Sequence, residues 1–148
     1  MTASKLPPNI QEFNEITAVL FGQLYASLPN PMDIDKDAVA RALGLADGRT
    51  RMSSGRAFNE VLSHTVQWLI REDFVRSQGK YPLQRMVLTK KGLAGMSAVP
   101  PSLSQPLGSE LADATKQAST EGGKTRISQM MGDFWGSFLG SFTKSISG

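Results

Sequence analysis

Apolar residues recur every three or four positions in several stretches of the chain, which is the spacing of one face of an α-helix. The first such stretch runs from Ile10 to Leu28. Pro29 and Pro31 follow it, and proline ends a helix because it lacks the backbone N–H and clashes with the preceding turn. The pattern therefore predicts a long first helix over roughly 10–28.

Two further helices are predicted before residue 73. Asp35 is suited to cap the second helix, and Gly44 is suited to the left-handed position that ends it. Ser53 or Ser54 is expected to cap a third helix that runs to about Glu72. The inward-facing positions predicted for the third helix are Phe58, Val61, Leu62, Thr65 and Leu69.

After the third helix the pattern changes to short β-prone segments. Residues 74–76 and 85–88 flank a polar stretch, 77–84, which contains Gly79. This arrangement predicts a β-hairpin with a long tip. Thr89 can cap a short helical segment after it. The predicted fold class is mainly α with a small β-hairpin.

The composition changes again at Ala98. Residues 98–124 hold three prolines among many Ser, Gly, Thr and Ala residues, and they are predicted to form a linker with a weak helix from Ser109. Residues 125–148 return to the helical period and predict an amphipathic C-terminal helix. The predicted organisation is a flexible N-terminus over 1–9, a domain over 10–97, the linker and this helix.

The C-terminal helix needs a docking surface to be ordered, because its three glycines cost about 3 kcal/mol of helix propensity relative to alanine. It can dock on its own domain or a second copy, in the groove of a protein partner, or on a membrane surface. Few basic residues accompany it, which disfavours the membrane. The residues predicted to form this interface are Ile127, Met131, Phe134, Trp135, Phe138, Leu139 and Phe142, with Gly132, Gly136 and Gly140 permitting close approach.

Charge is distributed unevenly along the 148 residues. The formal net charge of the chain is only +3. Residues 48–97 carry nine Lys and Arg against three Asp and Glu, a net charge of +6, whereas residues 1–47 carry −3. The middle third is therefore the candidate surface for a polyanion.

The composition argues against several kinds of chemistry. The chain has no cysteine and one histidine, His64, so disulfides, thiolate chemistry, histidine metal clusters and a Ser-His-Asp triad are not expected. His64 is predicted to be a packed residue at the rim of the core. The first residues lack the apolar segment of a secretory signal, and no 18-residue apolar run is present. We expect a cytoplasmic, non-enzymatic protein without metal or cofactor.

The stretch from the third helix to the hairpin resembles winged helix-turn-helix domains. Leu69 ends the helix, Asp73 stands at a turn position that is usually glycine, Phe74 begins the strand, and residues 88–92 read Leu-Thr-Lys-Lys-Gly. This pattern is similar to the N-terminal domain of Mrr-like restriction proteins and to PadR-like or MarR-like regulators, over about residues 10–97. The resemblance implies that the third helix enters the DNA major groove and that the hairpin, the wing, contacts the neighbouring backbone.

Charge and resemblance together predict a transcriptional regulator that binds double-stranded DNA and uses its C-terminal helix for oligomerisation or partner docking. The alternative is a scaffold or adaptor whose aromatic helix recruits a complex or a membrane. Phosphate contacts are expected near the start of the third helix, base contacts along it, and phosphate or minor-groove contacts at the wing. The predicted residues are, in that order, Arg49, Arg51, Ser53, Ser54 and Arg56; Asn59 and Gln67; and Arg76, Gln78, Lys80 and Arg85.

Overall fold

The computed structural model describes residues 6–100 and 103–147, with side chains up to residue 136. It contains mainly helices and one two-stranded antiparallel sheet, which confirms the predicted fold class at that level. In chain order the elements are α1 (Pro8–Ser27), α2 (Lys36–Ala42), α3 (Phe58–Arg71), β1 (Val75–Ser77), β2 (Met86–Leu88), α4 (Lys90–Ser97), α5 (Leu107–Ala114), the 3-10 helix η1 (Thr115–Gln117) and α6 (Glu121–Ser147).

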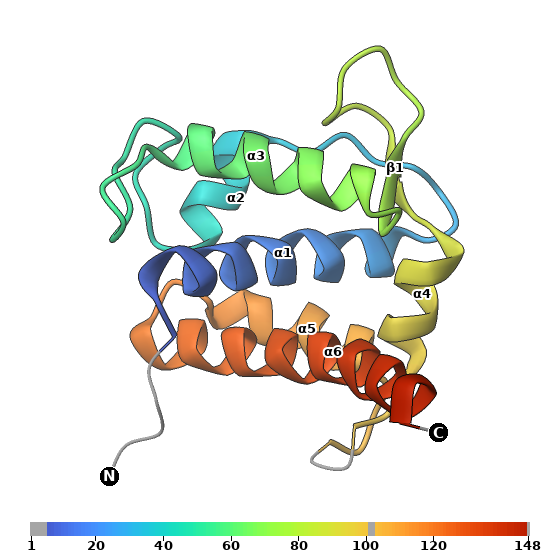
Figure 1. Ribbon diagram of the computed structural model, residues 1–148. Helices are drawn as coiled ribbons and strands as arrows, with labels where there is room; N and C mark the ends of the chain where they lie inside the picture. Colours follow the sequence, from blue (N-terminus) through green and yellow to red (C-terminus); the bar gives the residue numbers. More distant parts are fainter. Residues whose placement is uncertain (1–5, 101–102, 148) are drawn as a thin grey trace, which may run out of the picture.

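Helix α1 is the centre of the structure. Figure 1 shows α2 and α3 on one side of it, α5 and α6 on the other, and α4 near its C-terminal end. Because helices cover it on two sides, α1 buries far more than the single stripe that its periodicity predicts, including Glu12, Asn14 and Glu15. Its bounds agree with the prediction from the two prolines that follow.

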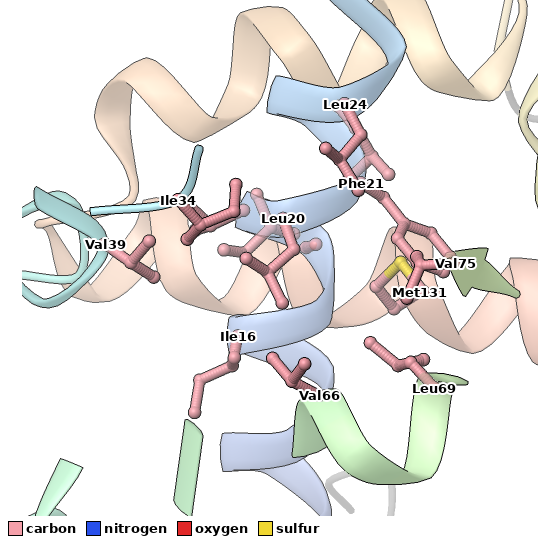
Figure 2. Close-up of a cluster of buried hydrophobic side chains, with 14 of the residues drawn as sticks. Ile16, Leu20, Phe21, Leu24, Ile34, Val39, Val66, Leu69, Val75 and Met131 are labelled. Atoms are coloured by element: carbon pink, nitrogen blue, oxygen red, sulfur yellow. The ribbon is translucent and has the colours of Figure 1, made fainter. Parts of the chain in front are cut away.

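A continuous core joins the two sides of α1. Ile16 and Leu20 face α2 and α3 in Figure 2, near Val39 and Val66, whereas Phe21 approaches Met131 of α6. All six of these side chains are at most 1% exposed. The described part of α6 therefore belongs to the same hydrophobic core as the first three helices.

Short-range interactions of single residues define the ends of several helices. The Asp35 carboxylate accepts hydrogen bonds from the backbone N–H groups of Asp37 and Ala38 at the start of α2. The Thr89 hydroxyl accepts one from Gly92 at the start of α4. Gly44 adopts a φ of +81° after α2, as predicted. These interactions involve residues at most three positions apart, so a sequence pattern can reveal them.

The hairpin has a third, very short neighbour. β1 pairs with β2 in the register Val75 with Leu88, Arg76 with Val87 and Ser77 with Met86. On the edge of β2 that faces away from β1, Met86 exchanges two backbone hydrogen bonds with Met32, at 2.8 and 2.9 Å. Asp73 adopts a φ of +66° in the turn before β1, the conformation that usually selects glycine. The segment between α1 and α2 thus ties the hairpin to the helices.

The stretch predicted as a linker contains ordered helices in its described part. Leu107 and Leu111 of α5 are buried against α1. A Cβ atom on Gly22 would lie 3.4 Å from the backbone of Ala112, and one on Gly108 would overlap the Tyr25 ring. The small residues that suggest a linker are thus the residues that let α5 lie directly on α1.

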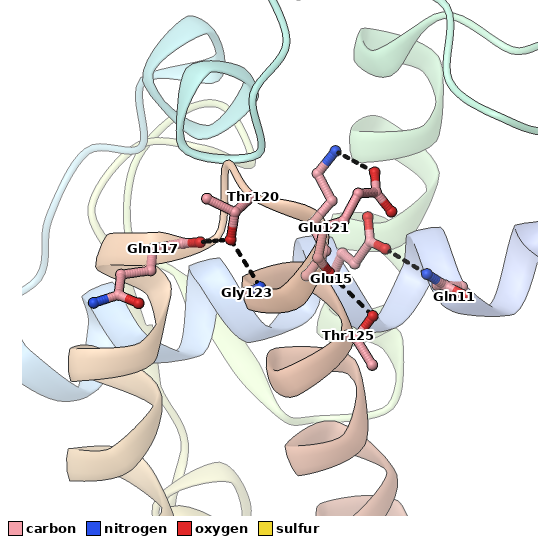
Figure 3. Close-up of polar contacts among 8 residues, drawn as sticks. Gln11, Glu15, Gln117, Thr120, Glu121, Gly123 and Thr125 are labelled. Atoms are coloured by element: carbon pink, nitrogen blue, oxygen red, sulfur yellow. Dashed lines mark hydrogen bonds and ion pairs between the residues drawn. The ribbon is translucent and has the colours of Figure 1, made fainter.

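Helix α6 begins at Glu121, four residues before the predicted start. Figure 3 shows the turn that begins it: the Thr120 hydroxyl accepts a hydrogen bond from the Gly123 N–H at 2.9 Å and donates one to the Gln117 carbonyl. This is the geometry of a helix N-cap. Thr120 is therefore the N-cap residue of α6.

Within the described chain, Gly132 and Gly136 of α6 do not provide a close approach to another helix, and their predicted role at an intermolecular contact stays a prediction. Apart from the adjacent residues and the backbone of α6 itself, no described atom lies within 4 Å of a Cβ built on Gly132 or Gly136, and both glycines are exposed. A Cβ on Gly95 of α4 would instead overlap the Phe134 ring. Gly140 lies outside the described side chains. Close approach between these helices therefore depends on a glycine of α4, because α6 presents its aromatic stripe to the core.

Candidate nucleic-acid interface

Helix α3 has one polar face that is open to solvent. Ser63, Gln67 and Arg71 are exposed and follow each other at four-residue intervals, so they lie along one side of the helix. Gln67 Nε2 donates a hydrogen bond to Ser63 Oγ at 3.3 Å. The opposite side of the helix is anchored in the core by Leu62, Thr65, Val66 and Leu69, among others.

A hollow of about 200 Å³ lies between α2, α3 and the hairpin tip. It is lined by Asn59, Ser63 and Gln67 of α3, Lys36 of α2 and Tyr81 of the hairpin, together with apolar neighbours. Its polar side chains include groups that both donate and accept hydrogen bonds. The hollow therefore combines a cation, hydrogen-bonding groups and an aromatic ring beside the exposed face of α3.

The hairpin tip is held by its own hydrogen bonds. The Gln84 side-chain oxygen accepts from the backbone N–H groups of Lys80 and Tyr81, at 3.2 and 3.3 Å. Ser77 Oγ donates to the Gln84 carbonyl, and the Arg85 N–H donates to the Asp33 carboxylate at 2.8 Å. These hydrogen bonds fix the conformation of the tip. The Tyr81 side chain projects from it and is 57% exposed.

The cations of the hairpin are accessible. Arg76, Lys80 and Arg85 are all exposed, and Lys80 Nζ lies 5.6 Å from the centre of the Tyr81 ring. Gln78, the uncharged residue predicted at the wing, lies between Arg76 and Lys80 and is also exposed. In Figure 1 the hairpin rises from the C-terminal end of α3 and its tip lies over the C-terminal half of the helix, whereas the basic loop over 48–57 lies at the N-terminal end. Helix α3, with 14 residues and a length of about 21 Å, thus has cations of the loop at its N-terminal end and cations of the hairpin along its C-terminal half.

The predicted role of Ser54 is wrong. Its N–H and its hydroxyl donate hydrogen bonds to the two carboxylate oxygens of Glu12, both at 2.7 Å. Glu12 lies on α1, is only 3% exposed, and is 42 residues away in sequence. Ser54 therefore fastens the loop to α1, and its donors are not available to cap α3 or to bind phosphate. Ser53 is exposed but likewise makes no cap for α3.

The N-terminus of α3 is not a phosphate site either. The helix begins at Phe58, with Ala57 at the N-cap position and no side-chain cap. The Phe58 N–H donates to the Thr50 carbonyl and the Asn59 N–H to the Gly48 carbonyl, both at 2.9 Å. The first N–H groups of the helix are thus used by the loop that folds back beside it, which corrects the prediction of an open anion-binding terminus.

Asn59 is also poorly placed to read a base. It is half-buried, its side-chain oxygen is buried without a hydrogen-bond partner, and a Cβ on Gly48 would overlap its amide group. Packing against the loop explains this position. Of the two predicted base-reading side chains, only Gln67 is exposed on α3.

The three arginines of the loop remain accessible. Arg49, Arg51 and Arg56 are exposed. Arg51 Nη1 donates to the Gly55 carbonyl at 2.6 Å, which leaves its other N–H groups free for a ligand. Arg56 lies 3.9 Å from Glu60, but both side chains are more than half exposed, so this ion pair holds the guanidinium weakly.

The sequence predictions missed four residues of this surface: Lys36, Ser63, Arg71 and Tyr81. The four-residue spacing from Ser63 through Gln67 to Arg71 is a signal that could have identified two of them. Lys36 and Tyr81 reach the hollow from α2 and from the hairpin. Only the folded arrangement brings those two elements to α3.

The residues predicted to form an intermolecular interface on α6 are largely used within the chain. Ile127, Met131 and Phe134 are at most 1% exposed. Trp135 is half-buried, and its indole N–H donates to the Asn14 side chain at 3.0 Å. This corresponds to docking on its own domain, one of the predicted alternatives. Phe138, Leu139 and Phe142 lie outside the described side chains, so an oligomeric or adaptor role for them stays a prediction.

Metal clusters and membrane spans are two kinds of site that the described part of the chain lacks. No group of three or more acidic or histidine side chains there could hold a metal ion. None of the described helices has the length and apolar character needed to cross a membrane. Comparison with known proteins gave no match to a protein-family model, a curated sequence or a solved structure.

Proposed function

We propose that the chain is a winged helix-turn-helix protein that binds double-stranded DNA, with α3 facing the major groove and the hairpin acting as the wing. The observation that carries the proposal is the exposed polar face of α3, which has the hollow beside it and accessible cations on the adjoining loop and hairpin. The order of α1, the Met32 bridge, α2, α3 and the hairpin supports the same assignment.

The proposed division of labour follows from the chemistry of each group. Arginine and lysine side chains at the loop and the hairpin neutralise phosphates, which sets the affinity and its dependence on salt. Gln67, with an amide that can pair with an adenine edge, supplies base discrimination together with Ser63. A role in transcriptional regulation follows if the preferred sites are specific sequences.

Fluorescence anisotropy with a labelled duplex at several salt concentrations tests the proposal. The double variant Arg49→Ala/Lys80→Ala removes one cation from the loop and one from the hairpin. We expect the slope of log affinity against log salt to fall by about 0.9 for each phosphate that is no longer neutralised, about 1.8 in total. Lys116→Ala is the matched control, because Lys116 is an exposed cation on η1, away from this surface.

Gln67→Ala separates affinity from specificity. We expect it to reduce discrimination between duplex sequences by about 1–3 kcal/mol while leaving the salt slope unchanged. No binding at low salt would refute the DNA proposal. So would a double variant that binds duplex with the same affinity and salt slope as the unchanged protein.

A further inference from the structure

A second recess lies on the other side of α3, between α3 and the first turns of α1. Its volume is about 430 Å³, within the range of small-molecule sites. Ile10 and Phe13 of α1 and Val61 and Trp68 of α3 form its apolar walls. It shares no lining residue with the hollow beside Gln67. We refer to it as the α1–α3 groove.

The aromatic rings of the groove are held in place from behind. Trp68 stacks on Phe74 with ring centres 6.1 Å apart and planes at 14°, and it meets Phe13 edge-on at 5.3 Å. Phe13 in turn stacks on Trp135 of α6 at 5.7 Å. Trp68 nevertheless remains 38% exposed and neighbouring Ile10 41%. The groove therefore offers fixed aromatic surface to a ligand without prior rearrangement.

The charges that line the groove favour a cation. Glu12 and Glu60 contribute two carboxylates and Arg56 one guanidinium, and His64 at the edge is exposed rather than packed in the core as predicted. Arg56 is the partner of Glu60 at 3.9 Å. Glu12 is buried and accepts its hydrogen bonds from Ser54, and no described cation lies within ion-pair distance of it. The formal charge of the lining side chains is −1, with His64 neutral.

We propose that the α1–α3 groove binds an organic cation with an apolar or aromatic body, such as a quaternary ammonium or a protonated amine. The face of an indole ring attracts a cation through its quadrupole, and tryptophan is the strongest of the aromatic side chains in this respect. The carboxylates add Coulomb attraction, and the apolar walls accept the body of the ligand. An anion of equal size is repelled by the same carboxylates, and the one cationic side chain of the lining, Arg56, is the ion-pair partner of Glu60.

Three probes of matched shape test this directly on the full chain: benzyltrimethylammonium, the neutral benzyl methyl sulfone, and anionic benzylsulfonate. Binding is followed by NMR through the indole N–H signals of Trp68 and Trp135. We expect the cation to bind most tightly and the anion least, with the Trp68 signal shifting. No DNA is present, so the result is independent of whether the protein binds DNA.

Two variants locate the site. Trp68→Leu keeps an apolar side chain but removes the indole face, and we expect cation affinity to fall roughly two- to fivefold. Glu60→Gln, at an exposed position, removes a carboxylate and frees Arg56, and it should weaken the cation but not the neutral sulfone. Gln67→Ala, on the other face of α3, is the control and should bind all three probes normally.

Several results would overturn the proposal. Equal affinity for the three probes would show that the groove does not select charge. Cation binding that neither Trp68→Leu nor Glu60→Gln weakens would place the ligand elsewhere. Binding that appears only after removal of residues 1–5 would assign the groove to the N-terminal segment of the chain itself.

Discussion

Phe134→Ala is the most direct test of whether α6 is part of the core or an appendage. The Phe134 side chain is 1% exposed and lies 5.3 Å from the Phe21 ring of α1 and 5.8 Å from the Phe74 ring before β1. Gly95 of α4 lies so close that a Cβ atom on it would overlap the Phe134 ring. Truncation therefore opens a cavity between three segments that are distant in sequence.

The expected cost is about 3–5 kcal/mol, the usual range for Phe→Ala in a core. This is a large share of the roughly 5–15 kcal/mol that stabilises a typical domain. Urea unfolding followed by tryptophan fluorescence and far-UV circular dichroism measures it. Both probes should report one transition, because Trp68 on α3 and Trp135 on α6 belong to one aromatic cluster.

Gly136→Ala is the matched control on the same helix. Gly136 is exposed and its Cβ site is open, so the change removes no packing and adds up to about 1 kcal/mol of helix propensity. The reasoning is refuted if Phe134→Ala costs less than about 1 kcal/mol. It is equally refuted if fluorescence and circular dichroism report separate transitions in the unchanged protein.

Three further outcomes follow from single contacts. Gly95→Ala should destabilise by about 1–3 kcal/mol in thermal unfolding despite alanine's better helix propensity, because the new methyl overlaps the Phe134 ring; a rise in Tm would contradict this. Ser54→Ala leaves the buried Glu12 carboxylate with one hydrogen bond fewer and should cost about 1–3 kcal/mol in urea, and an unchanged midpoint would show that the contact is not formed. Burial raises the pKa of Glu15 above 4.5, so the folded chain holds this proton more tightly. The contribution of Glu15 to the free energy of unfolding therefore falls as the pH rises from 4.5 through the folded-state pKa. Glu15→Gln should raise the stability at pH 7 and flatten this decline. The same dependence of stability on pH in both proteins would contradict the prediction.

The features that the sequence predicts well depend on chemistry within a few residues. Pro29 ends α1, Asp35 and Thr89 cap their helices, and Gly44 takes its left-handed conformation. Asp73 adopts a positive φ in the turn before β1, at the position where the sequence predicts one. Each of these depends on one side chain and its immediate backbone, so no knowledge of the tertiary fold is needed.

The candidate site is less predictable because its residues have distant partners. A serine near a helix start is usually a cap, yet Ser54 binds Glu12 from a different helix. Asn59 has a side chain suited to adenine but is packed against Gly48. Lys36 and Tyr81 carry no local signal and join the surface only through the arrangement of α2 and the hairpin.

The apolar stripe of α6 shows why periodicity alone does not identify the surface on which a helix docks. A second copy could bind Ile127, Met131 and Phe134 only if α6 left α1. Exposing these three side chains costs roughly 1.5–3 kcal/mol each, or about 5–9 kcal/mol together, a sum comparable to the stability of a domain. An oligomer that uses this stripe therefore has to return an equivalent helix to the same place on α1, which is an exchange of α6 between two chains. Any contact that leaves α6 docked has to use its outer face or the residues after Gly136.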